Sequence, residues 1–192
     1  MKRSLFTLLT ILLACSLYAI APVTREGKFN LKRCRGAVAT FYIDWDNARC
    51  GAIEDGVFIK SATPIEQWIA QNDTLGEWET TVEECAKYFR NKWNDEFGRR
   101  GLRLSFNPDE ATYHINLVID GLDWGNMSGS EFGYGNSGGA ILTGYMDLID
   151  RGTGKLVARY NIRQVQGSGH VSDRFRLLLA LHELVEELEE IR

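Results

Sequence analysis

The amino-acid sequence predicts an α+β domain, with an antiparallel-rich sheet of four to five strands and helices packed on one face. Two observations lead to this prediction. Several segments carry apolar residues at every second position, which is typical of half-buried strands, and two carry them at every third or fourth position, which is typical of amphipathic helices. Their order along the chain is strand, helix, strands, helix. We therefore expect a single domain over residues 37–192.

The first half of this domain is predicted to hold one strand and two helices. Residues 37–44, AVATFYID, are rich in branched and aromatic side chains and should form the first strand. A short helix is expected after Thr63-Pro64, because proline fits the first helical turn. A longer helix is expected over residues 75–97, ended by Gly98. Its apolar stripe consists of Trp78, Val82, Cys85, Phe89, Trp93 and Phe97.

The second half is predicted to hold a short strand, LRLSF at residues 102–106, then three longer strands and a final helix. ATYHINLVID, residues 111–120, alternates apolar with polar side chains. Two further strands are expected at about 140–150 and 155–166. The last helix should begin near Ser172, and its apolar stripe consists of Leu177, Leu178, Leu181, Leu184, Val185, Leu188 and Ile191.

The turn between the last two strands decides their register. A two-residue turn would divide the apolar side chains between both faces, whereas a three-residue loop ending in a left-handed Gly154 places Met146 opposite Tyr160. The same register places Asp147 opposite Arg159 on the other face, where opposite charges are mildly favourable. We predict the three-residue loop.

The N-terminus is predicted to direct export. Lys2 and Arg3 precede an apolar run, so residues 1–21 are typical of a secretory signal peptide. LLAC, ending at Cys15, matches the lipobox of bacterial lipoproteins, and Ala19-Ile20-Ala21 matches an ordinary cleavage site. The first route gives an outer-membrane-anchored protein and the second a soluble periplasmic one, and both stay open. Residues 22–36 are polar and are expected to form a tether.

Apart from Cys15, which the lipoprotein route retains as a lipidated residue, the mature chain has three cysteines, Cys34, Cys50 and Cys85. Because three is an odd number, at least one of these cysteines stays unpaired or bonds to another chain, and the pairing among them is left open. Cys85 lies on the apolar stripe of the long helix, so it should be buried. Cys34 lies between basic residues, which should lower its pKa, and we expect it to be a surface thiol.

Charge and motifs argue against several classes of function. The formal net charge of -4 disfavours a nucleic-acid partner. FGYGNSGGA has the spacing of a dinucleotide-binding turn, but a strand follows it in place of a helix, so no cofactor is expected. The histidines His114, His170 and His182 do not cluster in sequence, and we expect no metal site.

Two sets of residues are candidates for binding. Trp124, Phe132 and Tyr134 combine rigid aromatic rings with a glycine-rich loop, although such a loop is equally a mobile hairpin tip. Tyr145, Arg159 and Arg163 should share the outer face of the terminal hairpin. This face is either plain solvated sheet or a surface that binds a carboxylate or sugar-acid group through forked hydrogen bonds.

A further pattern resembles a known class. It comprises the first strand ending at Asp44, Ala111-Thr112-Tyr113-His114-Ile115, Gly144-x-Met146-x-Leu148-x-Asp150 with Thr153-Gly154-Lys155-Leu156, and Gly167-x-Gly169 before the last helix. Over residues 37–190 the chain resembles secreted or lipidated bacterial envelope domains similar to the N-terminal domain of TolB and to CsgG-like and LpoB-like lipoproteins. The resemblance implies an α+β fold, an envelope location and a role in binding or assembly, and it carries over no catalytic residue.

The expected function is therefore a non-catalytic binding or assembly module of the cell envelope. Its partner would be an envelope protein or a glycan, with membrane contact only through a lipid on Cys15. Two alternatives remain. One is a secreted hydrolase that uses Asp44 and Asp46 near His114, and the other is a carrier of a small ligand.

Overall fold

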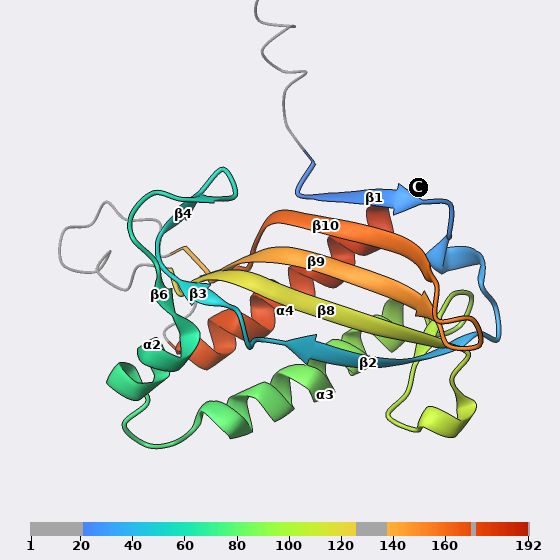
Figure 1. Cartoon of the computed structure of the whole chain (residues 1–192), viewed down its shortest axis with the longest axis horizontal. Coiled ribbons are helices and arrows are strands. Elements are labelled where there is room, and N and C mark those ends of the chain that lie inside the picture. The colour runs from blue at the N-terminus through green and yellow to red at the C-terminus, as the bar shows by residue number, and fades with distance from the viewer. Residues whose placement is uncertain (1–20, 126–137, 170–171, 192) are drawn as a thin grey trace, which may run out of the picture.

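The computed structural model describes residues 21–125, 138–169 and 172–191 (Figure 1). One mixed sheet carries two long helices on one of its faces, α3 (Trp78–Glu96) and α4 (Asp173–Glu190) (Figure 1). The predicted α+β class and the helices on one face are thus confirmed. The strand count is wrong, because the sheet has eight strands in place of four to five, and some of them pair in parallel.

The main path of the sheet runs β1-β10-β9-β8-β2-β7, with β3 and β6 beside β8. Its strands are β1 (Val23–Gly27), β2 (Val38–Asp44), β3 (Arg49–Cys50), β6 (Thr63–Pro64), β7 (Arg103–Leu104), β8 (Tyr113–Asp123), β9 (Ile141–Asp150) and β10 (Leu156–Gln166). A separate hairpin consists of β4 (Ile53–Glu54) and β5 (Val57–Phe58). The predicted short strand at 102–106 is confirmed as β7, whereas β3, β4, β5 and β6 are too short to show alternation and were not predicted.

The parallel pairs involve β2, β3, β7 and β8. Between β2 and β8 the chain passes through α2 (Ile65–Asn72) and α3, and a crossover of this kind returns the chain in the same direction. β8, β9 and β10 follow one another directly and are antiparallel. Antiparallel pairs also join β1 to β10 and β3 to β6, so the sheet is mixed, with antiparallel and parallel pairs in the same layer.

The expected tether is partly a strand of the domain. β1 forms the edge of the sheet and pairs antiparallel with β10, with Val23 opposite Ile162. Val23 and Leu31 are buried, with 3% and 4% exposure, so the domain begins earlier than residue 37. A short edge strand with one buried side chain leaves no periodic pattern, which is why the segment reads as polar and irregular.

The predicted hairpin register is confirmed. Met146 lies opposite Tyr160 and Asp147 opposite Arg159. Gly154 has a φ of 67°, the left-handed conformation that the three-residue loop requires. The carboxylate of Asp150 accepts a hydrogen bond from the backbone N–H of Thr153 at 2.8 Å, which holds the turn and lowers the pKa of Asp150.

The core lies between the sheet and the two long helices. The expected stripe of α3 faces it, with Cys85, Phe89 and Trp93 fully buried. Across the surface of the helix pair, Lys92 of α3 forms an ion pair with Glu186 of α4 at 2.9 Å. The two helices therefore pack against each other as well as on the sheet.

Cys34, Cys50 and Cys85 are free thiols, and Cys34 differs from what the sequence predicted. Cys85 is fully buried, as predicted, and burial raises its pKa to about 12. Burial likewise raises the pKa of Cys50 to about 11. Cys34 was expected to be an exposed thiol with a lowered pKa, but it is partly buried, its pKa is raised, and its Sγ donates to the backbone oxygen of Leu31 at 2.9 Å.

Candidate functional site

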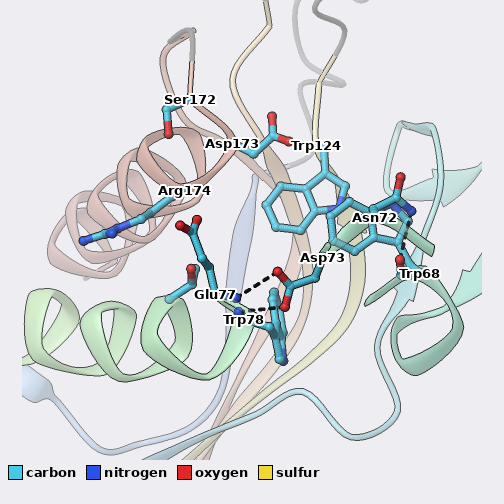
Figure 2. A pocket seen from close by; sticks show the side chains of 10 residues that line it. Trp68, Asn72, Asp73, Glu77, Trp78, Trp124, Ser172, Asp173 and Arg174 are labelled. Atoms are coloured by element: carbon cyan, nitrogen blue, oxygen red, sulfur yellow. Dashed lines mark hydrogen bonds between the residues drawn. The ribbon is translucent and has the colours of Figure 1, made fainter. Parts of the chain in front are cut away.

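A pocket of about 270 Å³ opens where α2 ends and where α3 and α4 begin (Figure 2). Three tryptophans from different elements meet in it: Trp68 of α2, Trp78 of α3, and Trp124, which follows β8. We call this the tryptophan pocket. Its other lining residues are Asn72, Asp73, Glu77, Thr81, Ser172, Asp173 and Arg174.

The indole rings hold one another in place. Trp68 and Trp124 are stacked, with ring centroids 4.6 Å apart and planes 21° from parallel. Trp78 meets Trp124 edge to face at 6.4 Å. Beneath them, Trp45 meets Trp78 edge to face at 5.7 Å and is itself buried. Four of the five tryptophans of the chain thus form one cluster, which gives the pocket a fixed aromatic wall.

Asp73 sets the start of α3 and so the place of Trp78. One carboxylate oxygen accepts the backbone N–H of Glu77 at 2.9 Å, and the other accepts that of Trp78 at 3.0 Å (Figure 2). These N–H groups belong to the first turn of the helix, which has no internal partners for them. Asp73 therefore acts as a cap that links the end of α2 to the beginning of α3.

Arg176 fixes the backbone that carries Trp124. Its side chain is buried, with 2% exposure, and its Nη1 donates to the backbone oxygen of Trp124 at 2.6 Å and to that of Gly125 at 3.2 Å. Its Nη2 lies 3.0 Å from Oδ1 of Asp173. α4 is thereby tied to the end of β8 directly behind the tryptophan pocket.

Acidic groups outnumber basic ones on the lining. Asp73, Glu77 and Asp173 face one cation, Arg174, whose guanidinium pairs with Glu84 of α3. Asp73 and Asp173 stand at the positive ends of helices, which favour a negative charge there. Glu77 is exposed at the rim. The pocket thus combines aromatic surface with oxygen acceptors, a combination suited to a ligand that has both apolar faces and hydroxyl groups.

The predicted loop residues are placed in part. Trp124 lies in the pocket, in contact with two other indoles. Phe132 and Tyr134 lie outside the described residues, as does the lipidation candidate Cys15. Nothing in the sequence connects Trp124 to Trp68 or Trp78. The one sign of this aromatic cluster in the sequence is that Trp68 precedes Asn72-Asp73 and Trp78 follows it. The helical pattern, however, placed Trp78 on the core stripe of α3.

The predicted outer face of the terminal hairpin includes an arginine that is already paired within the chain. Tyr145, Arg159 and Arg163 lie on the sheet away from the tryptophan pocket. The guanidinium of Arg159 donates two hydrogen bonds to Asp147, at 2.6 and 2.7 Å, and lies 4.3 Å from the ring centre of Tyr145. The pair with Asp147 raises the pKa of Arg159. Because the fork of Arg159 is occupied within the chain, it is not available for a carboxylate or sugar-acid group in this arrangement.

Replacing Arg163 with alanine should lower the free energy of unfolding by about 1 kcal/mol or less. The side chain is exposed, and its Nε donates to the backbone oxygen of Asp55 at 3.1 Å. Chemical denaturation measures the change, with Arg99→Ala at another exposed position as the control. A loss of several kcal/mol would contradict the exposed position of Arg163.

The groups expected for a hydrolase are not assembled around Asp44. His114 Nδ1 is hydrogen-bonded to the hydroxyl of Thr40 at 3.0 Å, while Asp44 pairs in register with Val118, further along β8. The carboxylate of Asp44 accepts the backbone N–H of Asp46 at 3.0 Å and so makes the turn after β2. Burial, followed by the charge of Arg151, lowers the pKa of His114.

Within residues 21–125, 138–169 and 172–191, no three His, Cys, Asp or Glu side chains come together so that they could hold a metal ion. In the same part of the chain, no helix has the length and apolar character needed to cross a membrane.

Comparison with known proteins finds similarity to solved structures only. No protein-family model matches the chain, and no curated protein does. A dodecamer of PelC from Paraburkholderia phytofirmans is 11% identical, with a TM-score of 0.47 over 88% of this chain and 98% of that one. A variant of the same PelC in another crystal form is 12% identical, with a TM-score of 0.42 over 88% and 97% of the two chains.

An uncharacterized protein is also 12% identical, with a TM-score of 0.39 over 84% of this chain and 95% of that one. At these identities and scores, the likenesses say nothing further about this chain. The resemblance to TolB-like, CsgG-like and LpoB-like domains therefore stays a prediction from the sequence.

Proposed function

We propose that this protein is an exported, non-catalytic binding module of the bacterial cell envelope, and that its tryptophan pocket binds a glycan. The observation that carries the proposal is the meeting of Trp68, Trp78 and Trp124 with side-chain oxygens at the junction of three helices. The apolar run after Lys2-Arg3 supports export, by either of the two routes that the sequence leaves open.

A sugar ring matches both kinds of surface in the pocket. Its C–H faces pack on indole rings, and its hydroxyl groups donate to carboxylate and amide oxygens such as those of Glu77 and Asn72. The volume of about 270 Å³ is near the lower end of ligand pockets, so it accommodates a short segment of a glycan.

The carboxylates of the pocket support binding in preference to catalysis. Asp73 is engaged with two backbone N–H groups, and Asp173 with Arg176. Both carboxylates are therefore already occupied by contacts within the chain, and neither is left free to act on a ligand as a general acid or base.

Replacing Trp68 with alanine should weaken glycan binding about tenfold, because it removes one face of the stacked pair that forms the wall. Binding is measured by titrating bacterial envelope oligosaccharides and following tryptophan fluorescence, which reports directly on the cluster. Calorimetry on the same samples gives an independent affinity.

Tyr42→Ala is the matched control. Tyr42 is also an aromatic side chain, 54% exposed, but it lies on β2 away from the pocket, so its removal should leave affinity unchanged. Equal loss in both variants, or no binding of any oligosaccharide by the wild-type protein, would count against a glycan site at Trp68.

A further inference from the structure

The β4–β5 hairpin presents two large apolar side chains to solvent. Val57 is 66% exposed and Ile59 is 55% exposed, whereas Ile53 on the opposite face of the hairpin is buried, with 6% exposure. Asp55 and Gly56 form its turn in the left-handed conformation, with φ of 51° and 77°. The exposed apolar groups therefore sit beside a tight turn that lies against β10.

The hairpin is held firmly on the sheet. The backbone N–H of Gly56 donates to the side-chain oxygen of Gln164 at 2.8 Å, and Arg163 Nε donates to the backbone oxygen of Asp55. A Cβ on Gly56 would lie 2.6 Å from the backbone oxygen of Arg163, so only glycine allows this close approach. Val57 and Ile59 are thus displayed on a rigid support.

The same residue of β10 also contacts the point where the chain enters the domain. The backbone N–H of Arg163 donates to the backbone oxygen of Pro22 at 2.9 Å. The hairpin tip and the start of the domain are therefore neighbours, and Figure 1 shows the hairpin rising beside the beginning of β1. Residues 1–20, which precede this point, contain the apolar run and Cys15.

Length limits how far the domain can lie from an anchored N-terminus. Six residues, 16–21, separate Cys15 from Pro22, and even fully extended they span only about 20 Å. A bilayer that holds the N-terminal segment, or a lipid on Cys15, therefore lies within reach of the hairpin. Tethering of this kind makes a weak apolar contact intramolecular and so raises its occupancy.

We propose that the β4–β5 hairpin rests on the surface of the lipid bilayer, with Val57 and Ile59 in the boundary between headgroups and acyl chains. Charges of both signs lie next to these two residues in the chain, with Glu54 and Asp55 before Val57 and Lys60 after Ile59. The contact is apolar and should be insensitive to the fraction of anionic lipid.

The contact is tested with the full chain reconstituted into vesicles of phosphatidylethanolamine and phosphatidylglycerol that contain a lipid with a photoreactive diazirine in its acyl chain. After illumination, mass spectrometry locates lipid adducts on peptides. We expect adducts at residues 57–59, and a similar yield when the phosphatidylglycerol is replaced by phosphatidylcholine.

Changing Val57→Asp together with Ile59→Asp should reduce these adducts about tenfold, because charged side chains do not enter the acyl boundary. Leu75→Asp is the matched control: Leu75 is 79% exposed but lies between α2 and α3, and its variant should retain the adducts. Trp68→Ala should retain them too, which separates this inference from the glycan site.

Two results would overturn the proposal. One is the absence of lipid adducts on the hairpin of the wild-type protein in vesicles. The other is an adduct yield per chain that rises as protein is diluted with lipid, because a second copy of the chain would then have covered the hairpin at high protein density. Because Val57 and Ile59 are exposed, the double variant should fold normally. An unchanged midpoint of thermal unfolding would show that it does.

Discussion

Replacing Trp93 with alanine should lower the free energy of unfolding by about 4 kcal/mol. The side chain is fully buried on α3, it packs against Phe89 and Phe97 with ring centroids 5.7 and 4.7 Å away, and its Nε1 donates to the backbone oxygen of Leu102 at 2.6 Å. Removing it leaves a cavity between helix and sheet and an unpaired carbonyl. Urea denaturation measures the change.

Trp93→Phe separates these two contributions. It keeps most of the buried ring but loses the hydrogen bond to Leu102, so we expect a smaller cost of about 1–3 kcal/mol. An alanine variant as stable as the wild type would mean that α3 does not pack on the sheet through this face.

Replacing Arg176 with alanine should cost about 3 kcal/mol and also weaken ligand binding. The buried guanidinium donates to the backbone oxygens of Trp124 and Gly125, so its removal leaves both carbonyls without this donor and releases the strand end that carries Trp124. The first effect is measured by denaturation and the second by oligosaccharide titration of the folded variant.

Arg174→Ala is the control for stability, since Arg174 lies two residues earlier on the same helix and is 44% exposed. Its ion pair with Glu84 is at the surface, where such pairs contribute about 1 kcal/mol or less. If the two variants lost equal stability, Arg176 would not be the buried link between α4 and β8. If Arg176→Ala lost stability but kept full affinity, the link would be purely structural.

Elements that depend on local periodicity follow from the sequence. The stripe of α3 and the alternation in β8 require only that one side of each element face a core, and both are seen. The register of β9 and β10 could also be predicted, because a short turn couples it directly to the pattern of apolar residues. Met146 opposite Tyr160 is the outcome of that coupling.

Elements that form only by pairing with distant parts of the chain could not be predicted from the sequence. β1 and β3 have too few residues to show a pattern, and they exist because β10 and β8 offer backbone groups to pair with. The predicted direction of the Cys34 pKa shift was wrong for a related reason. Partial burial raises this pKa, and burial outweighs the effect expected from the basic residues beside it in the sequence. Burial is a property of the assembled domain.

The candidate site shows the same division. The sequence by itself predicted Trp124 as a candidate binding residue, because an aromatic ring beside a glycine-rich loop is recognisable locally. Only the tertiary structure decided that Trp68 and Trp78 join it, since α2, α3 and the end of β8 meet through the crossover that makes β2 and β8 parallel. Contacts between residues far apart in the chain arise from that topology, and no local pattern encodes them.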